Sequence, residues 1–493
     1  MASDAQRYAN FIGGQWLPPS NGEYEANSNP ADASDVIGHW PKSGREDAKA
    51  AIDAAAKAFP AWSRTPSPAR GRIVARAHQL LTAKKHELAL ALCREEGKTL
   101  TESLGEVQKG LNLLEFYGGE GLRMHGKTLP SEMPSTFMAT IRQPVGVAAL
   151  VTPWNFPFAI PVWKSAPALV AGCTIVMKPA SLTPLCATML AKAYEEAGLP
   201  PGVFNLVTGP GSTCGDELVA NPLVRAISFT GSNGVGLRLY QQAAARGARV
   251  TLEMGGKNPV VVLDDADLDL AVEGIAQGAF GSTGQRCTAT SRVVATPGVY
   301  GQLCERLAEK AKAIKVGNGQ HAGVTMGPAV DAKQHKTDLD YIAIAKAEGA
   351  RLVAGGENLR ELGGFFVAPT VFADVSPSMR LFKEEVFGPV LSITKAADFN
   401  EAVEAANAVE FGLAASIYTQ SATAAMRFIE RSEVGMVHVN QPTVGGEAQL
   451  PFGGIKSTGV GEKEMGEEGL NFFTHLKTVF FDYTGSKRES NIY

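Results

Sequence analysis

The sequence predicts an α/β fold that contains two parallel-sheet units. Two observations lead to this prediction. From about residue 145 onward, short apolar runs alternate with segments of helical periodicity, and the alternation begins again near 259. Strands that alternate with helices in this way are typical of parallel sheets covered by helices. The length of 493 residues also suggests about three domain-sized units, at roughly 150 residues each.

The segment before the first sheet is expected to be helical. Residues 47–62 are rich in alanine, with charges spaced along them, as in a surface helix. In residues 65–95 the apolar side chains recur at helical spacing and predict one or two more helices. These helices precede the first predicted strand.

The first parallel-sheet unit is predicted from apolar runs with helical segments between them. The runs expected to be strands are 147–151, 174–178, 203–207, 226–229 and 250–253. The intervening helices are expected at 160–171, 186–197, 215–220 and 234–245. This order is that of a parallel sheet with helical crossovers.

A second series of the same kind follows a seam near 255–260. Strands are expected at 260–263, 292–295, 352–353, 414–418 and 435–439. Helices are expected at 268–278, 300–314, 338–347, 399–407 and 423–431. Residues 478–483 read as one extended strand without a sheet of its own, which favours pairing with a partner subunit and hence an oligomer.

Composition and charge exclude several classes of protein. The 46 basic and 50 acidic residues nearly balance, whereas nucleic-acid-binding proteins usually carry a basic patch. No run of about 18 apolar residues predicts a transmembrane helix, and the polar N-terminus lacks the apolar core of a signal peptide. The six cysteines form no C-x-x-C pair, which argues against a disulfide framework and favours a reducing, cytoplasmic location. The eight histidines show no ligand spacing, so no metal site is expected.

Cys287 is the cysteine with the most informative surroundings. It lies in a loop rich in glycine, serine and threonine and follows Arg286, whereas the other cysteines have apolar or helical neighbours and are interpreted as buried, inert thiols. An adjacent cation favours the thiolate, which is the nucleophilic form. Cys287 is therefore the predicted nucleophile, although the loop alone also fits a structural thiol.

Two polar residues at predicted strand ends complete a catalytic set. Glu253 ends an apolar strand, and in an α/β sheet the carboxyl ends of strands face the ligand crevice. Asn155 also lies at a strand end, and its amide can donate a hydrogen bond to a developing oxyanion. Considered alone, Glu253 could also be a solvated glutamate at a strand end. Considered alone, Asn155 could also be an ordinary turn residue. Together with Cys287 they predict a base and an oxyanion donor beside a nucleophile.

Glycine clusters after two predicted strands suggest a phosphate site. Residues 208–211 and 229–236 each follow a strand, and the second cluster opens a helix. Glycines let a phosphate approach the backbone N–H groups at a helix N-terminus. Lys178, at another strand end, could bind a ribose or a phosphate. Tight strand–helix turns and a surface lysine are the alternatives that stay open.

Several motifs occur in one order along the chain. They are 153–157 (PWNFP), 177–180 (MKPA), 229–232 (FTGS), 252–257 (LEMGGK), 284–287 (GQRC), 385–389 (EVFGP) and 451–456 (PFGGIK). In this order and spacing they resemble the aldehyde dehydrogenase superfamily over nearly the whole chain. The resemblance implies an aldehyde dehydrogenase-like α/β fold with two Rossmann-type parallel-sheet domains and a small β oligomerisation element. The implied ranges are 1–122 and 145–255 for a dinucleotide-binding domain, 256–455 for a catalytic domain, and 123–144 with 470–493 for the oligomerisation element of a homodimer or homotetramer.

The resemblance also implies a mechanism, the NAD(P)-dependent oxidation of an aldehyde to a carboxylic acid. The Cys287 thiolate attacks the aldehyde carbon, and the Asn155 side chain and the Cys287 backbone N–H stabilise the oxyanion of the thiohemiacetal. Hydride transfer to the nicotinamide leaves a thioester, and Glu253 activates the water that hydrolyses it. Glu467 matches the family's second, proton-relay glutamate.

By the same resemblance, Lys178 and Glu385 hold the cofactor ribose and Ser232 contacts the pyrophosphate. Strictly NAD-using members often carry glutamate after the Lys-Pro-Ala motif, where this chain has Ser181. A glutamate would repel a 2′-phosphate and a serine would not, so NADP is expected to be accepted as well as NAD, or preferred. The other residues expected at the cofactor are Thr152, Trp154, Gly211, Thr230, Gly231, Gly255 and Phe387.

Residues 285–292 and 439–447 make the chain resemble most the α-ketoglutaric semialdehyde (2,5-dioxovalerate) dehydrogenases of sugar-acid catabolism. The expected reaction is therefore the oxidation of 2,5-dioxovalerate to 2-oxoglutarate. Arg286 either pairs with the substrate carboxylate or packs under the loop. Succinate-semialdehyde dehydrogenases often have arginine where this chain has Trp163, so succinic semialdehyde and general aliphatic or aromatic aldehydes stay open. The side chains expected to line the substrate tunnel are Phe156, Trp163 and Pro442.

Three other classes of function compete with this interpretation. A CoA-acylating semialdehyde dehydrogenase generally lacks the glutamate that matches Glu253. A non-enzymatic protein on a dehydrogenase scaffold would not need Cys287, Glu253 and Asn155 together. A Cys–His hydrolase needs a histidine near its nucleophile, and none of the motifs contains one.

Overall fold

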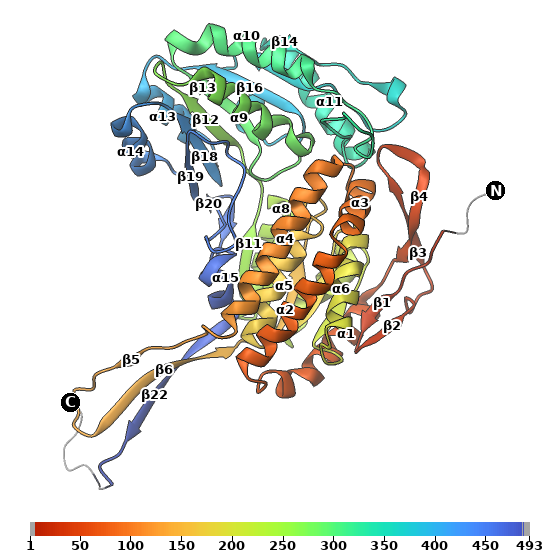
Figure 1. Ribbon diagram of the computed structural model, residues 1–493, viewed down its shortest axis with the longest axis vertical. Helices are drawn as coiled ribbons and strands as arrows, with labels where there is room; N and C mark the ends of the chain where they lie inside the picture. Colours follow the sequence, from red (N-terminus) through yellow and green to blue (C-terminus); the bar gives the residue numbers. More distant parts are fainter. Residues whose placement is uncertain (1–4, 486, 488–493) are drawn as a thin grey trace.

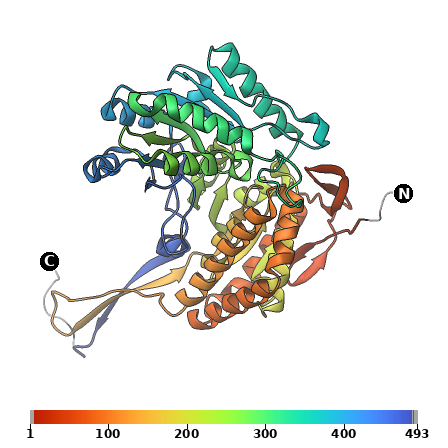
Figure 2. The same cartoon turned by 45° about the horizontal axis from the view of Figure 1, so that its top comes forward.

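The computed structural model describes residues 5–485 and 487, and two large sheets dominate it (Figure 1). The two sheets lie in separate lobes, and a long arm of strands extends away from the lobe that holds the N-terminal helices (Figures 1 and 2). Residues 1–4 of the predicted dinucleotide-binding domain lie outside the described residues, as do residues 486 and 488–493 of the predicted oligomerisation element. None of the described helices has both the length and the apolar character needed to span a membrane.

The first lobe contains an eight-stranded sheet with a parallel core. Its strand order is β2-β1-β9-β8-β7-β10-β11-β21. The central parallel strands confirm the predicted ones: β7 (Val147–Val151), β8 (Thr174–Lys178), β9 (Phe204–Leu206), β10 (Val224–Thr230) and β11 (Arg249–Glu253). The edges carry antiparallel strands that the sequence analysis missed: β1 (Asn10–Ile12), β2 (Gln15–Leu17) and β21 (Gly459–Val460).

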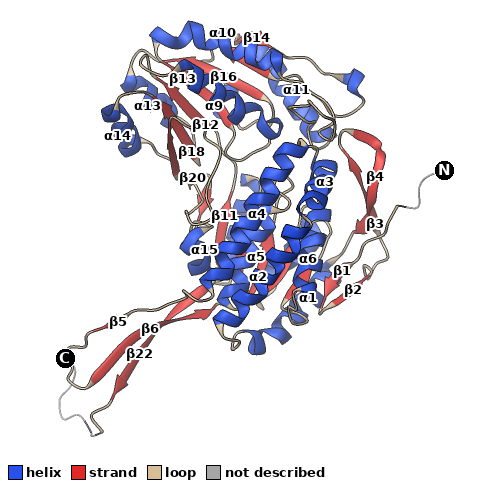
Figure 3. Cartoon of the chain, in the orientation of Figure 1, coloured by secondary structure: helices blue, strands red, loops and turns tan. Residues whose placement is uncertain are grey.

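Alternating side chains of this sheet enter two separate apolar cores. Ala148 and Leu150 of β7 join a core on one face, whereas Val147 and Ala149 join a core on the other. Because helices cover both faces (Figure 3), these strands are apolar throughout and appear in the sequence as short continuous apolar runs. The helices of this lobe are α1 (Arg45–Trp62), α2 (Ser67–Ala83), α3 (Lys85–Glu96), α4 (Leu100–Glu120), α5 (Ala159–Ala171), α6 (Leu185–Glu196), α7 (Asp216–Ala220) and α8 (Asn233–Ala244).

Helix α4 was not predicted, yet it carries several charged residues toward the space between the lobes. The helix begins with a capping box, in which the Thr99 hydroxyl accepts from Glu102 N at 3.3 Å and the Glu102 carboxylate accepts from Thr99 N at 3.0 Å. It packs against α2 and α5. The Thr-x-x-Glu spacing is the sequence signal that could have revealed it.

The second lobe contains a seven-stranded sheet in the order β14-β15-β16-β13-β12-β18-β19. Only β14 runs antiparallel to its neighbour. The strands are β12 (Asn258–Val262), β13 (Thr290–Ala295), β14 (Arg351–Ala354), β15 (Thr370–Ala373), β16 (Val390–Lys395), β18 (Ala414–Tyr418) and β19 (Met436–Val439), of which β15 and β16 were not predicted. The helices are α9 (Leu268–Phe280), α10 (Pro297–Ala313), α11 (Ala332–Ala347), α12 (Arg380–Lys383), α13 (Phe399–Asn407) and α14 (Ala422–Arg431).

The arm is a three-stranded sheet that joins the end of the chain to residues near 140 (Figure 1). Strand β22 (Thr474–Asp482) pairs antiparallel with β6 (Thr136–Pro144) along its whole length, and β6 also pairs with β5 (Thr128–Leu129). The prediction that the C-terminal strand lacks a sheet of its own is therefore wrong. Its pairing partner lies more than 300 residues earlier, where no local pattern reveals it. Phe480 and Phe481 are 70% and 60% exposed on the arm.

The remaining elements are short and connect the lobes. A hairpin of β3 (Tyr24–Asn29) and β4 (Asp32–Pro41) lies beside α3. After β19 the chain returns from the second lobe to the first through β20 (Ile455–Lys456), which pairs with β17 (Phe411–Gly412), and then through β21 and α15 (Gly466–Phe472). This return segment brings residues 453–464 next to the end of β11.

Candidate active site

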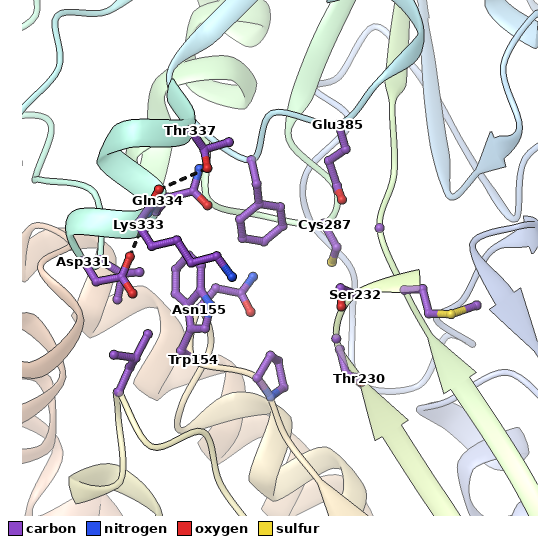
Figure 4. Close-up of a pocket in the computed structure, with 17 residues that line it drawn as sticks. Trp154, Asn155, Thr230, Ser232, Cys287, Asp331, Lys333, Gln334, Thr337 and Glu385 are labelled. Atoms are coloured by element: carbon purple, nitrogen blue, oxygen red, sulfur yellow. Dashed lines mark hydrogen bonds between the residues drawn. The ribbon is translucent and has the colours of Figure 1, made fainter. Parts of the chain in front are cut away.

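A cavity of about 440 Å³ lies between the two lobes, at the carboxyl ends of β7, β10 and β11. Loops from both sheets line it, as expected for a ligand crevice in an α/β protein. In Figure 4 the side chains of Asn155, Cys287 and Glu385 face the same space. The predicted site residues that line the cavity are Trp154, Asn155, Thr230, Gly231, Ser232, Gly255, Cys287, Glu385 and Phe387.

The loop before Cys287 has an unusual backbone that the surrounding structure holds in place. Ser282 and Thr283 have φ values of 49° and 58°, in the left-handed region that non-glycine residues rarely adopt. Ser282 N donates to Glu102 of α4 at 2.6 Å, and the Thr283 hydroxyl donates to Gly327 O at 3.1 Å. At Gly284 a Cβ atom would lie 2.3 Å from Gly388 O, so only glycine fits. The loop therefore presents Cys287 in one fixed position.

Burial and nearby carboxylates favour the protonated form of the Cys287 thiol. The pKa of this thiol is raised to about 12: burial is the largest cause, Glu253 and Glu385 also raise it, and Lys109 and the Thr288 N–H oppose them. The Arg286 cation is expected from the sequence to favour the Cys287 thiolate, and the position of Arg286 does not support this expectation. The Arg286 guanidinium donates to the Ser282 hydroxyl at 2.9 Å and lies 3.8 Å from Glu102, so it packs under the loop.

Asn155 is buried at the end of β7, next to the Cys287 loop. Its side-chain amide donates to Gln285 O at 3.0 Å, two residues before the thiol. A buried ion pair fixes its backbone: Lys98 donates to Asn155 O at 2.7 Å and to Glu106 at 2.6 Å. Glu106 in turn accepts from Phe158 N at 2.9 Å, at the start of α5. The amide is thus held beside the nucleophile, where a hydrogen-bond donor can stabilise an oxyanion.

Glu253 lies at the end of β11 with a second carboxylate, Glu464, close by. Burial raises the pKa of Glu253 well above its usual value, and the Glu464 charge adds to this rise, while Lys164 opposes it. Glu464 accepts hydrogen bonds from the Trp163 indole at 2.8 Å and from the Ser228 hydroxyl at 2.6 Å, and it forms a buried ion pair with Lys164.

The structure does not bring Glu467, the predicted second glutamate, to this group. Glu467 lies at the start of α15 and lines a different pocket, together with Glu120 and Arg123. Glu464, three residues earlier, is the glutamate whose charge acts on Glu253. The segment around both residues has no helical or strand periodicity from which their directions could be predicted.

The cofactor residues fall into two groups. Glu385 accepts from Gly256 N at 2.8 Å, and burial raises its pKa to about 7. At Gly255 a Cβ atom would lie 2.1 Å from the Glu385 carboxylate. The buried Thr230 hydroxyl has no hydrogen-bond partner among the described residues. A cradle without room for a side chain, next to an unpaired hydroxyl, fits a bound ligand with polar groups such as a dinucleotide.

The second group does not line the cavity between the lobes. Lys178 is buried at the end of β8 and donates to Pro179 O at 3.0 Å. The Ser181 hydroxyl donates to Gly209 O at 3.3 Å, which places the two strand-end loops side by side. Gly211 opens the turn that follows Gly209, and the buried Thr152 hydroxyl has no hydrogen-bond partner within residues 5–485 and 487.

Helix α11 supplies cavity residues that the sequence analysis missed. Lys333, Gln334 and Thr337 line the cavity beside Asp331 (Figure 4). The Gln334 amide donates to Val386 O at 3.0 Å and thereby ties α11 to the Glu385 loop. Asp331 caps the helix by accepting from Gln334 N at 2.8 Å. An aspartate three residues before glutamine is the signal that could have placed the helix start at 332.

None of the residues predicted to contact the substrate, which are Phe156, Trp163, Arg286 and Pro442, is among the residues that line this cavity. Trp163 packs against Phe452 with ring centroids 5.2 Å apart. The Phe156 ring lies 4.2 Å from Lys98 Nζ. Phe156 and Cys287 both pack against the apolar core that contains Trp163 and Phe452. Pro442 lies near Gly274 of α9.

Comparison with known proteins gives consistent matches over nearly the whole chain. A model of the aldehyde dehydrogenase family matches residues 16–479. The alpha-ketoglutaric semialdehyde dehydrogenase of Bacillus subtilis is 44% identical, covering 97% of this chain and 99% of that protein. The 2,5-dioxopentanoate dehydrogenase of Saccharolobus solfataricus is 48% identical, covering 94% and 98%. A crystal structure described as an NADP-dependent enzyme of E. coli is 39% identical, with a TM-score of 0.94 and coverage of 97% and 98%.

Proposed function

Since the chain belongs to the aldehyde dehydrogenase family, we propose that it oxidises 2,5-dioxovalerate to 2-oxoglutarate through a covalent intermediate on Cys287. NAD or NADP, when bound, accepts the hydride. Two observations carry the proposal: the buried Asn155 amide bonds to the loop that holds Cys287, and the buried Glu253 carboxylate is close enough to Cys287 to raise the pKa of its thiol. The identity of 44% and 48% to relatives named for this substrate supports the choice of aldehyde.

In the proposed reaction the protein divides one difficult step into two. The Cys287 thiol first loses its proton to solvent, the resulting thiolate attacks the aldehyde carbon, and the Asn155 amide stabilises the resulting oxyanion. After oxidation the acyl group remains on Cys287 as a thioester. Glu253 then accepts a proton from the water that attacks this thioester, with Glu464 and Lys164 behind it. The presence of Glu253 favours transfer of the acyl group to water over its transfer to a thiol such as coenzyme A.

Substrate preference tests the proposal directly. We expect kcat/KM for 2,5-dioxovalerate to exceed that for pentanal, an uncharged aldehyde of the same chain length, by at least about tenfold, the effect of one charge-assisted hydrogen bond. The measurement is the rate of nicotinamide reduction by ultraviolet absorbance, with succinic semialdehyde as a shorter anionic comparison. Equal or better turnover of pentanal would contradict the assigned substrate and leave a general aldehyde dehydrogenase.

NADP is expected to serve as well as NAD, because Ser181 carries no charge to repel a 2′-phosphate. Replacing Ser181 with Glu is expected to lower kcat/KM for NADP at least about tenfold and to change that for NAD much less. Initial rates with both cofactors, at one fixed aldehyde concentration, give both values. NADP turnover about a hundredfold below that of NAD in the unaltered protein, a gap of roughly 2.7 kcal/mol, contradicts this prediction.

We further propose that the arm joins copies of this chain into a homodimer or homotetramer. Its exposed apolar side chains support this, since a monomer rarely leaves several large ones together in water: Leu129, Phe137, Ile141, Leu476, Phe480 and Phe481. Sedimentation equilibrium distinguishes the two states. A cytoplasmic location is part of the same proposal, and the free thiol state of all six cysteines supports it.

A further inference from the structure

Lys109 of α4 extends into the place where α4, α5 and the 440–452 segment meet. Its Nζ lies 5.6 Å from the centroid of the Trp163 ring and 5.9 Å from that of Phe452. It also donates a hydrogen bond to Gly446 O at 3.3 Å. The ammonium group therefore lies against two aromatic rings and one backbone carbonyl, and one of the rings belongs to Trp163, a residue predicted to line the substrate tunnel.

This ammonium group has no carboxylate partner of its own among the described residues. The nearest acid along the helix, Glu106, is already bound to Lys98 and to the backbone at the start of α5. Glu464 is bound to Lys164, Ser228 and Trp163. A half-buried cation that neither of these acids neutralises is available to pair with the charge of a ligand.

Three other cations lie near the nucleophile, and their surroundings differ from those of Lys109. Lys333 lines the cavity between the lobes, among the residues predicted at the cofactor. Arg286 is held by Ser282 and Glu102, under the loop. Lys98 is held by Glu106 and Asn155 O. Succinate-semialdehyde dehydrogenases often have arginine at the position of Trp163. The Trp163 side chain carries no charge. Lys109 differs from these three cations because it has no carboxylate partner among the described residues and lies against Trp163, a residue predicted to line the substrate tunnel.

Lys109 is also close enough to Cys287 to affect it electrostatically. The Lys109 charge lowers the pKa of the Cys287 thiol, and Cys287 in turn raises the pKa of Lys109, which burial lowers. Cys287 and Phe156 pack against the same apolar core as the two rings below Lys109. An extended five-carbon aldehyde acid places its carboxylate roughly 5 Å from the aldehyde carbon, at about 1.2 Å per bond.

We propose that Lys109 binds the distal carboxylate of the substrate and thereby sets the preference of this enzyme for anionic semialdehydes. The proposal rests on the proposed function, because it explains how 2,5-dioxovalerate would be recognised. In this arrangement the aldehyde carbon lies at Cys287, the aliphatic chain runs past the aromatic walls, and the carboxylate accepts hydrogen bonds from the Lys109 ammonium. The ion pair between Lys109 and the substrate carboxylate holds the far end of the substrate. This fixes the distance between the aldehyde carbon and Cys287.

The test compares Lys109→Met with the unaltered enzyme on 2,5-dioxovalerate and on pentanal. Methionine keeps much of the side-chain volume and removes the charge. We expect kcat/KM for 2,5-dioxovalerate to fall roughly 30-fold or more, mainly through KM, and that for pentanal to change less than about threefold. Lys109→Arg should recover part of the loss. Lys192→Met is the matched control, since Lys192 also lies over two aromatic rings, 5.9 Å from each centroid, but far from the cavity.

A second measurement separates carboxylate binding from an effect on the thiol. Glutarate has no aldehyde and cannot react with Cys287, so its inhibition constant reports binding of the acid alone. Weaker inhibition by glutarate in Lys109→Met, by a factor similar to the loss in kcat/KM, supports the proposal. Equal losses for both aldehydes, with a shifted pH profile and unchanged glutarate inhibition, would show that Lys109 acts on the thiol and would overturn it.

The substrate preference of the unaltered enzyme tests the proposed function separately from the role of Lys109. If it prefers 2,5-dioxovalerate over pentanal and Lys109→Met keeps that preference, the role of Lys109 is wrong and the proposed function stands. If the unaltered enzyme shows no preference for the anionic aldehyde, the proposed function and the role of Lys109 both fail.

Discussion

Replacing Cys287 with Ala is expected to abolish aldehyde oxidation, with a fall in kcat of at least about 10⁴-fold, as for other enzymes that lose their nucleophile. No other group in the cavity can form the thioester, because the remaining cysteines lie outside it. The measurement is nicotinamide reduction at saturating aldehyde and cofactor, with the melting temperature as a check that the fold is kept.

The matched control is Cys304→Ala. Cys304 is a buried thiol of α10 in the core of the second lobe, away from the cavity. This variant is expected to lose some stability, as when a small apolar group leaves a core, but to keep its kcat. Residual activity above about 1% in Cys287→Ala, or a comparable loss of kcat in Cys304→Ala, would show that the nucleophile has been misassigned.

Replacing Glu253 with Gln is expected to stop the reaction after the thioester on Cys287 has formed and before it is hydrolysed. A glutamine cannot accept a proton from water, so we expect steady-state turnover to fall by about 10² to 10⁴-fold, the usual contribution of a general base. The first oxidation should still occur, because Cys287 and Asn155 are unchanged. Stopped-flow absorbance should therefore show a burst of one reduced nicotinamide per active site, and mass spectrometry an acyl group on Cys287.

Glu467→Gln provides the control for this variant, because Glu467 lies in a separate pocket at the start of α15. It is expected to behave like the unaltered enzyme. A complete absence of the burst in Glu253→Gln would mean that Glu253 acts before thioester formation. A similar slow phase in Glu467→Gln would restore Glu467 to the proton relay in which the geometry favours Glu464.

The pH dependence of turnover follows from the same carboxyl group. Glu253 must be deprotonated to act as a base, and burial together with Glu464 holds its pKa well above the usual range. The active fraction of Glu253 therefore grows as the pH rises toward that raised pKa. The slow thioester hydrolysis in Glu253→Gln should lack this dependence, which identifies the titrating group.

The parallel strands and the positions of Asn155 and Glu253 could be predicted from the sequence for the same reason. Strands buried on both faces are apolar throughout, and their carboxyl ends meet at one edge of the sheet. Asn155 and Glu253 follow such strands, whereas the Cys287 loop precedes β13, so only the family resemblance could place Cys287 with them in the proposed catalytic set.

The parts that could not be predicted depend on contacts without a local pattern. Residues 455–465 contain two-residue strands and turns, so nothing in the sequence distinguishes the direction of Glu464 from that of Glu467. Arg286 is next to Cys287 in sequence but is turned away by Ser282 and Glu102, which requires the left-handed backbone at Ser282. Lys109 lies on a helix that the analysis missed.

The return of the chain from the second lobe to the first has a consequence for biosynthesis. Glu464 reaches back 300 residues to Lys164, and β21 covers the edge of β11. A nascent chain that ends before Gly459 has made both sets of central strands, yet it leaves an open sheet edge and lacks the carboxylate behind Glu253. Open edges invite pairing with other chains. Emergence of residues 459–464 from the ribosome is therefore the event that both closes this edge of the first sheet and brings Glu464 to the proposed base, Glu253.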